Sequence, residues 1–283
     1  MTSWGRPTTV EIGVGTLDVR VDGPDDGEPV VLLHGFPQTS LSWGGVAPRL
    51  AAAGLRVVAP DQRGYSPGAR PTGVQHYTGD ALADDVAELA DELGLSTFHL
   101  VGHDWGASNA WVFATRHAAR LRSLTTVSVP HLAAFGEALR TSTDQQERSA
   151  YIRLFRVEGK AEGVLLTDGA ERLVGMYEGR VSADDVAAYV ALLAEPGALT
   201  AALDYYRAMS AELSHLPAVT VPTTFVWSSG DRALGRQGAE RCGDFVDAPY
   251  RFVELDGLSH WIPDEAPAAL ADAVLAQVQA VRA

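Results

Sequence analysis

Three side chains in this sequence have the types and the chain order that covalent catalysis requires. Asp104 stands between two glycines in Gly102-His103-Asp104-Trp105-Gly106, and Asp231 and His260 follow it along the chain. A side-chain nucleophile needs a base that moves a proton and an acid that orients the base. The order nucleophile, acid, histidine is typical of such sites on parallel sheets. The sequence therefore predicts that Asp104 is the nucleophile, His260 the base and Asp231 the orienting acid.

The residues around Asp104 predict a sharp turn between a strand and a helix. Residues 97–101 are short and apolar enough for a buried strand, and apolar residues then recur at helical spacing, namely Ala107, Ala110, Trp111 and Ala114. Such a turn raises its middle side chain above the sheet edge and requires glycine on both sides because the backbones approach closely. Serine usually occupies the middle position. A carboxylate suits attack on an alkyl carbon instead, because the resulting ester can be cleaved by water.

The choice of Asp231 and His260 follows from the strands predicted before them. Asp231 comes after a strand at 223–227, and His260 lies between a strand at 250–255 and the last helix. Catalytic groups gather at the carboxyl ends of parallel strands. The other downstream histidines and carboxylates are weaker candidates, because they are expected at helix ends, at the start of the helical segment or on the surface: His117, His131, His215, Asp244, Asp247 and Asp256.

Two further stretches bear on the chemistry. His34-Gly35-Phe36-Pro37 follows an early apolar strand, where a backbone N–H is needed for an oxyanion hole. The expected donors are the amides of Phe36 and Trp105. Gly64-Tyr65-Ser66-Pro67-Gly68 matches the spacing of a serine nucleophile turn, but its proline and second glycine prevent a helix from starting directly after the serine. We therefore expect no serine nucleophile.

The order of the predicted elements indicates the fold class. Strands and helices alternate up to Pro130 and again from Thr223, which predicts an α/β fold with a mostly parallel sheet and helices on both faces. The sequence between them is helical, with a capping-box pattern at Ser182-x-x-Asp185. We expect one core formed by residues 1–130 and 218–283, interrupted by a helical cap at residues 131–217.

Composition excludes several classes of function. The 283 residues carry a net charge of −14, which argues against nucleic-acid and anionic-membrane partners. Cys242 is the only cysteine, and the sequence has no GxGxxG, phosphate-loop or HExxH motif, so no cofactor and no metal are expected. The N-terminal stretch has no apolar signal core, which favours a cytoplasmic protein. The expected partners are a small substrate and water, and a homodimer is the expected assembly.

Together, these motifs resemble those of the α/β-hydrolase superfamily over essentially the whole chain. More narrowly, the chain is similar to the epoxide hydrolase and haloalkane dehalogenase branch, whose nucleophile is an aspartate. The matching motifs are His34-Gly35-Phe36-Pro37, Asp61-Gln62-Arg63-Gly64-Tyr65-Ser66, Gly102-His103-Asp104-Trp105-Gly106, Asp231 and His260-Trp261-Ile262-Pro263. The resemblance implies an α/β-hydrolase fold with an inserted cap, and hydrolysis of a small apolar epoxide to a vicinal diol through an ester of Asp104.

The resemblance also implies that two cap tyrosines hold the epoxide oxygen. Tyr151-Ile152-Arg153-Leu154-Phe155 resembles the segment of the first tyrosine, and residues 203–209 resemble that of the second. The role therefore falls on Tyr151 and Tyr206, with Tyr205 as the alternative to Tyr206. The expected substrate contacts are His34, Pro37, Trp105 and Phe155.

Two other functions stay open on sequence grounds. A haloalkane dehalogenase would use the same triad with N–H donors for the halide. Trp105 offers one such donor. The pattern of many haloalkane dehalogenases, however, has an asparagine directly after His-Gly, and this chain has Phe36 at that position. A binding protein with this fold would hold an apolar ligand under the cap without catalysis. The complete set of nucleophile, acid and histidine argues against that function.

Overall fold

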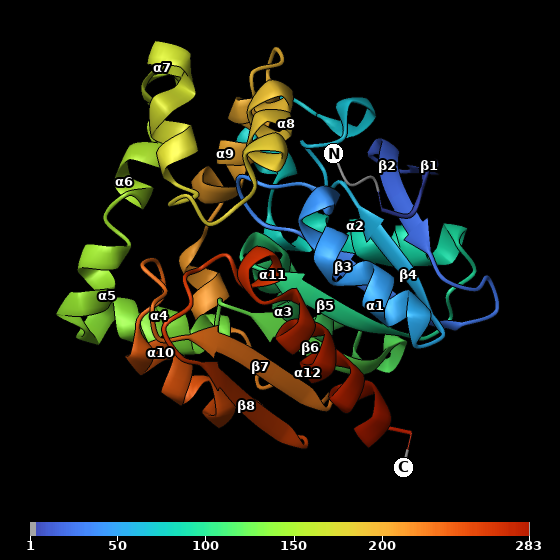
Figure 1. Ribbon diagram of the computed structural model, residues 1–283. Coiled ribbons are helices and arrows are strands. Elements are labelled where there is room, and N and C mark those ends of the chain that lie inside the picture. The colour runs from blue at the N-terminus through green and yellow to red at the C-terminus, as the bar shows by residue number, and fades with distance from the viewer. Residues whose placement is uncertain (1–3, 283) are drawn as a thin grey trace.

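The computed structural model describes residues 4–282. One eight-stranded sheet forms the centre of the fold (Figure 1). Its strands lie in the order β1-β2-β4-β3-β5-β6-β7-β8. β2 is antiparallel to both β1 and β4, and the pairs from β4 to β8 are parallel. The strands are β1 (Arg6–Ile12), β2 (Gly15–Asp22), β3 (Glu28–Leu33), β4 (Leu55–Pro60), β5 (Phe98–His103), β6 (Leu121–Val127), β7 (Thr223–Ser228) and β8 (Tyr250–Leu255). The predicted mostly parallel sheet is confirmed.

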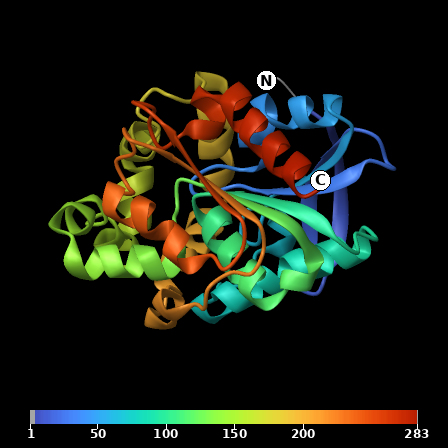
Figure 2. The ribbon, with the colours of Figure 1, turned by 90° about the horizontal axis from the view of Figure 1, so that it is seen from below.

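Helices cover both faces of this sheet, as the alternation of elements predicts (Figure 2). α1 (Ala47–Ala52) and α12 (Pro267–Ala280) lie on one face, and α2 (Gly79–Glu92), α3 (Trp105–Arg116) and α10 (Arg236–Arg241) lie on the other. The shorter elements are α11 (Ile262–Glu265), η1 (Ser40–Gly45), η2 (Pro67–Ala69), η3 (Val74–His76), η4 (Ala118–Arg120) and η6 (Cys242–Phe245). The central strands are therefore buried on both sides, which explains their continuous apolar runs.

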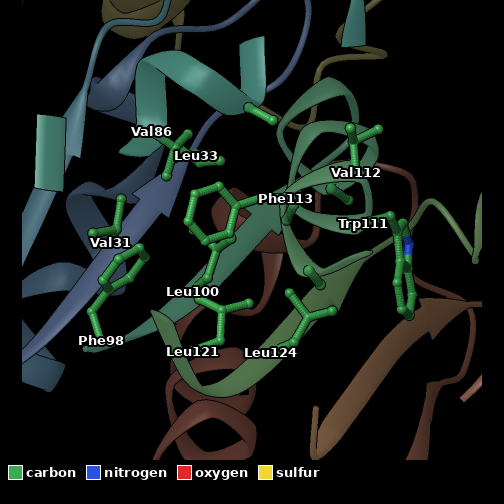
Figure 3. Close-up of a cluster of buried hydrophobic side chains, with 14 of the residues drawn as sticks. Val31, Leu33, Val86, Phe98, Leu100, Trp111, Val112, Phe113, Leu121 and Leu124 are labelled. Atoms are coloured by element: carbon green, nitrogen blue, oxygen red, sulfur yellow. The ribbon is translucent and has the colours of Figure 1, made fainter. Parts of the chain in front are cut away.

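Strand β3 shows how the two apolar cores form. Successive strand side chains point to opposite faces. Val31 and Leu33 belong to the cluster under α2 and α3, and Val30 and Leu32 belong to the cluster under α1 and α12. All four are completely buried. Figure 3 shows the first cluster, in which side chains of β3 and β5 meet those of α3. The sheet edge above these cores is thus a rigid base for a site.

Within residues 131–217 the structure has helices and turns but no strand. The helices are α4 (Leu132–Thr141), α5 (Thr143–Arg148), α6 (Ile152–Phe155), α7 (Lys160–Gly175), α8 (Ala183–Leu193), α9 (Ala198–Arg207) and η5 (Ala211–His215). At the start of α8 the hydroxyl of Ser182 accepts a hydrogen bond from the amide of Asp185 at 3.1 Å. The predicted helical segment and its capping residue are confirmed.

The two ends of this segment pack with the sheet layer. Leu132 of α4 and Leu213 of η5 join the apolar cluster under α3, and α4 also contacts α10 and η6. Helices α5 to α9 lie at the end of the sheet where the parallel strands finish (Figure 1). We propose on this basis that α5 to α9 form the cap, and that α4 and η5 connect it to the core within the limits 131–217.

No single helix among residues 4–282 has both the length and the apolar composition that a membrane span needs. α8 and α9 reach that length and composition only as a pair, and this pair is bent by 88°. The N-terminal stretch, from which we expect no signal sequence, begins with three residues that lie outside the described part of the chain.

Candidate active site

Asp104 lies on the turn between β5 and α3 in a strained backbone conformation. Its φ is 52° and its ψ is −118°, values that residues other than glycine rarely adopt. The neighbouring glycines are required for steric reasons. A Cβ atom at Gly102 would lie 2.2 Å from the carbonyl oxygen of Gly106, and one at Gly106 would lie 2.0 Å from that of Leu33. The turn expected from the Gly-x-Asp-x-Gly spacing is present, and it raises Asp104 at the carboxyl end of β5.

The structure brings Asp104, His260 and Asp231 together. Nε2 of His260 lies 3.4 Å from Oδ2 of Asp104, and Nδ1 of His260 donates to Oδ2 of Asp231 at 2.8 Å. The other oxygen of Asp231 accepts hydrogen bonds from the amides of Ala233 at 2.7 Å and Leu234 at 3.0 Å. Asp231 is completely buried. Because both of its oxygens are engaged, the orientation of the imidazole is fixed and Nε2 faces Asp104.

The charges of these buried groups support one another. Burial by itself would lower the pKa of His260, but the carboxylates of Asp231 and Asp104 outweigh burial and raise that pKa to about 10. Burial by itself would raise the pKa of Asp104, but His260 and the amide of Phe36 outweigh it and hold that pKa below its ordinary value. At neutral pH the site therefore contains an ionised Asp104 beside a protonated His260.

The amide of Phe36 holds one oxygen of the Asp104 carboxylate. Its N–H donates to Oδ1 at 2.8 Å. Phe36 belongs to the turn after β3, and its peptide bond to Pro37 is cis. Trp105, the other expected donor, is the first residue of α3, where a backbone N–H has no partner within the helix. Oδ1 therefore occupies a position where negative charge is stabilised, while Oδ2 faces His260.

Tyr206 faces Asp104, and Tyr205 does not. The hydroxyl of Tyr205 donates to the carbonyl of Arg63 at 2.7 Å, away from Asp104. Tyr206 lines the cavity above Asp104 together with Tyr151, and their ring centroids are 6.1 Å apart. Burial, together with the negative charge of Asp104, raises the pKa of both Tyr151 and Tyr206. Both hydroxyls therefore stay protonated and able to donate hydrogen bonds.

A cavity with two arms surrounds these groups. One arm has a volume of about 450 Å³ and the other of about 350 Å³. The residues that line both arms are Asp104, Tyr151, Tyr206 and Ala233. Trp105 lines the larger arm, and Phe36 and Phe155 line the smaller one. Apolar walls with a few convergent polar groups are typical of small-molecule sites. Where the two arms meet, the polar groups are the Asp104 carboxylate and the hydroxyls of Tyr151 and Tyr206.

Two expected substrate contacts, His34 and Pro37, do not line either arm. The ring of His34 is completely buried behind the turn, where Nε2 accepts from the amide of Gln62 at 3.0 Å and Nδ1 lies 3.0 Å from the carbonyl oxygen of Gly35. The carbonyl of Pro37 accepts a hydrogen bond from the Tyr177 hydroxyl at 2.6 Å. This corrects the expectation: neighbouring side chains in a tight turn point to different sides, and these two residues hold the turn that presents the Phe36 amide.

The candidates that the sequence disfavoured have structural roles. Ser66 is completely buried, accepts from the amide of Asp18 at 2.9 Å and donates to the carbonyl of Asp61 at 2.5 Å. The side chain of His131 caps α4 through the amide of Ala133 at 3.2 Å. The hydroxyl of Ser66 and Nδ1 of His131 are therefore used within the fold, and neither residue lines the cavity.

Sequence reasoning missed two contributions to the cavity. Leu132, Phe135 and Leu139 on α4 form part of the wall of the larger arm. Their helical spacing is visible in the sequence, but it shows only that one face of α4 is buried. Arg148 lines the smaller arm and donates to the carbonyl of Asp231. No sequence signal marks this contact, because it joins a side chain to a backbone group 83 residues away.

Comparisons with known proteins agree with this architecture. The family model described as alpha/beta hydrolase fold matches residues 28–267. An AB hydrolase superfamily protein, YfhM, of Bacillus subtilis is 33% identical over 92% of this chain and 93% of its own length. Epoxide hydrolase A of Mycobacterium tuberculosis is 30% identical over 96% of this chain and 97% of its own length.

Solved structures agree as well. The crystal structure of epoxide hydrolase A from Mycobacterium thermoresistibile superposes with a TM-score of 0.86 at 28% identity, covering 98% of each chain. The Bacillus megaterium epoxide hydrolase in complex with an inhibitor gives 0.87 at 26% identity, covering 96% of this chain and all of that one. The family model and the full-length relatives show that this chain belongs to the α/β-hydrolase superfamily, among relatives that include epoxide hydrolases.

Proposed function

We propose that the chain hydrolyses small apolar epoxides to vicinal diols. One observation carries the proposal: the Asp104 carboxylate, with Oδ1 held by the Phe36 amide, lies in an apolar cavity next to the hydroxyls of Tyr151 and Tyr206. An epoxide needs a nucleophile on one side of the ring and a proton donor on its oxygen, and this cavity offers both. The similarity to proteins named epoxide hydrolases supports the same function.

In the first step, Oδ2 of Asp104 attacks one ring carbon and the bond from that carbon to the ring oxygen breaks. Tyr151 and Tyr206 donate hydrogen bonds to that oxygen, and one of them transfers its proton. General acid catalysis of this kind contributes about 10²–10⁴-fold. The product is an ester in which the Asp104 carboxyl is joined to the alkyl chain.

The second step begins with a change of charge. Esterification makes Asp104 neutral, so one of the two carboxylates that hold the proton on His260 is lost and the pKa of His260 falls. The proton that His260 releases restores the hydroxyl of the tyrosine that gave its proton to the epoxide oxygen. Neutral His260, oriented by Asp231, then deprotonates a water that attacks the Asp104 carbonyl carbon. The Phe36 and Trp105 amides hold the oxyanion on Oδ1. When this intermediate collapses, the bond from the carbonyl carbon to the original Oδ2 breaks, His260 gives its proton to that oxygen, and the diol leaves. The carboxyl proton left on Asp104 then passes to His260 and restores the starting charges.

The two phenol hydroxyls favour an epoxide over a haloalkane. A halide leaves as an anion that needs no proton, whereas the oxygen of an opened epoxide does. Phe36 also supplies no side-chain N–H beside Asp104 for a halide. We therefore place haloalkane dehalogenation second, and simple ligand binding third, because a non-catalytic cavity does not require the strained Asp104 or its pairing with His260.

The proposal predicts where the oxygen of water goes. In a single turnover of excess enzyme with styrene oxide in H₂¹⁸O, we expect the label in the Asp104 peptide and unlabelled diol, because water attacks the Asp104 carbonyl. Peptide mass spectrometry measures the label. Label found only in the diol would show direct attack of water on the epoxide. Halide release from 1-haloalkanes, without diol from epoxides, would instead favour the second candidate.

Gly35 leaves only enough room for the Asp104 side chain. A Cβ atom at position 35 would lie 2.3 Å from Cβ of Asp104 and 2.5 Å from its Oδ1. We expect Gly35→Ala to move Oδ1 away from the Phe36 amide and to reduce kcat by about 10²–10³-fold, the usual cost of losing one oxyanion donor. Gly175→Ala on α7, where a Cβ meets no atom within 4 Å, is the control. Equal kcat values for the two variants would contradict the crowding argument.

The finer expectations rest on the sequence alone. A cytoplasmic location, a homodimer, and the absence of nucleic-acid and membrane partners stay predictions. For the substrate, the two arms that meet over Asp104 favour epoxides with apolar substituents on both sides of the ring.

A further inference from the structure

The loop that carries His260 is tied to the ends of three neighbouring strands. The hydroxyl of Ser228, the last residue of β7, donates to the carbonyl of Leu258. The hydroxyl of Ser128, directly after β6, donates to the carbonyl of His260 at 3.2 Å. The same carbonyl lies 3.0 Å from Nε2 of His103, the last residue of β5. The backbone of the histidine loop is therefore fixed by side chains from the sheet edge and not only by its own turns.

The contact between His103 and the carbonyl of His260 is not expected from the sequence. It is completely buried and its ring centroid lies 4.9 Å from that of His260. A carbonyl oxygen can only accept a hydrogen bond, so Nε2 of His103 carries the proton and donates. Burial and the neighbouring charge of His260 lower the pKa of His103 to about 4, so its ring is neutral at neutral pH. A neutral ring with its proton on Nε2 has an unprotonated Nδ1.

The environment of Nδ1 indicates the role of His103. Among residues 4–282, Nδ1 of His103 has no hydrogen-bond partner. An unpaired buried acceptor costs stability, and an apolar side chain at this position would avoid the cost. What a histidine adds here over leucine or methionine is one donor, directed at the backbone of His260. This observation distinguishes a positioning role from simple packing.

We propose that His103 is a positioning residue for the base: its Nε2–H, donated to the carbonyl of His260, sets the distance between the imidazole and Asp104. The role rests on the proposed function, since it concerns the step in which His260 deprotonates water. Because His103 directly precedes Asp104, one segment of β5 then fixes both partners. Any shift of the strand end would move the nucleophile and the base together, and Nε2 of His260 would stay near the ester that water must attack.

The test separates the two half-reactions in three variants. His103→Leu removes the donor, and His103→Gln keeps an N–H donor at a similar distance from the backbone. Thr126→Val is the control, because Thr126 is buried on β6 and its hydroxyl has no partner among residues 4–282. Rapid-quench mass spectrometry with styrene oxide measures ester formation and ester hydrolysis separately. Both rates are normalised to the fraction of protein molecules that can form the ester. With this normalisation, molecules that fail to fold do not affect the measured rates.

We expect His103→Leu to slow ester hydrolysis by about 10–100-fold, the usual effect of a small misplacement of a catalytic group. Ester formation, which does not use His260 as a base, should change much less. His103→Gln should restore most of the hydrolysis rate, and Thr126→Val should match the unmodified chain. Equal losses in both half-reactions, or a glutamine variant that behaves like the leucine variant, would overturn the proposal.

A second measurement does not depend on any substrate. The proton on Nδ1 of His260 lies in a buried hydrogen bond to Asp231, and histidine-labelled NMR spectra report its chemical shift and exchange. We expect the resonance to shift or broaden in His103→Leu and to be retained in His103→Gln and Thr126→Val. An unchanged resonance in His103→Leu would overturn the positioning role. If no epoxide forms an ester in the unmodified chain, the proposed function fails, and this readout still decides whether His103 positions His260.

Discussion

Replacing His260 with glutamine is expected to trap the enzyme as its ester. After addition of an epoxide, the intact mass should rise by the mass of one substrate, and steady-state turnover should fall by about 10²–10⁴-fold. Glutamine can accept and donate hydrogen bonds at the position of the imidazole, but it cannot take a proton from water. The first half-reaction needs only Asp104 and the tyrosines, so it continues and the second one stops.

The same variant should change the pH dependence of ester formation. In the unmodified chain, the effect of burial on the pKa of Asp104 is outweighed by protonated His260 and the Phe36 amide. The net pKa is below its ordinary value, so Asp104 is ionised at neutral pH. His260→Gln removes the positive charge, and burial then acts with less opposition, so the pKa of Asp104 rises. A carboxyl with a raised pKa is less ionised at low pH. Ester formation in the variant should therefore slow as the pH falls, within a range where the unmodified chain is insensitive.

The matched control is His117→Gln, at the carboxyl end of α3 and outside the cavity. It should turn over like the unmodified chain and accumulate no adduct. His260→Gln with full turnover and no adduct would contradict the assignment of the base. An adduct mapped by peptide mass spectrometry to a residue other than Asp104 would contradict the assignment of the nucleophile.

The sequence predicted those parts of the site that follow from local backbone rules. The turn around Asp104 requires glycines because of two contacts, at 2.2 Å and 2.0 Å, that a Cβ would make within the turn and with β3. This requirement for glycine on both sides of Asp104 is visible in the five consecutive residues 102–106. His260 and Asp231 were predictable because parallel strands end at the same edge, so that the loops after β7 and β8 must be neighbours.

The parts that could not be predicted depend on contacts across long stretches of chain. Whether Tyr205 or Tyr206 faces Asp104 is decided by a hydrogen bond from Tyr205 to the carbonyl of Arg63, 142 residues away. Pro37 is held outside the cavity by the hydroxyl of Tyr177, 140 residues away. Both acceptors are backbone carbonyls, which every residue carries. A pattern of side-chain types therefore contains no sign of either contact.

These contacts also explain how a segment of short helices can position Tyr206 over Asp104. Tyr205 lies on the same helix as Tyr206, and its hydroxyl is anchored to the core segment after β4. Consecutive helical residues are about 100° apart around the axis, so an anchored Tyr205 fixes the direction of Tyr206. The carbonyl of Tyr206 further accepts a hydrogen bond from Arg156 at 3.0 Å. The position of Tyr206, the proposed proton donor, is thus determined in part by contacts with the core, although Tyr206 belongs to the insertion.

Removing both cavity tyrosines should stop the reaction at its first step. In Tyr151→Phe and in Tyr206→Phe one donor remains, and we expect ester formation to slow by about 10–100-fold in each. In the double variant the breaking C–O bond has no proton donor, and we expect a loss of about 10²–10⁴-fold, the usual contribution of general acid catalysis. The rate is measured most directly in the His260→Gln background, where each ester that forms accumulates and is counted by intact mass.

Tyr205→Phe is the matched control for this prediction, since it removes a buried hydroxyl from the residue adjacent to Tyr206. Its hydroxyl contacts the carbonyl of Arg63 and does not reach the cavity. We expect a loss of stability of about 1 kcal/mol, the usual net value of one hydrogen bond. Ester formation should be nearly unchanged, because the buried ring at position 205 and the hydrogen bond from Arg156 to the Tyr206 carbonyl still hold α9 in place. A control as slow as Tyr206→Phe would mean that anchoring of α9, and not proton donation, limits the rate. A double variant that forms the ester at the unmodified rate would remove the reason to prefer epoxides over halides, because both assignments share Asp104 and His260 and differ in what assists the leaving group.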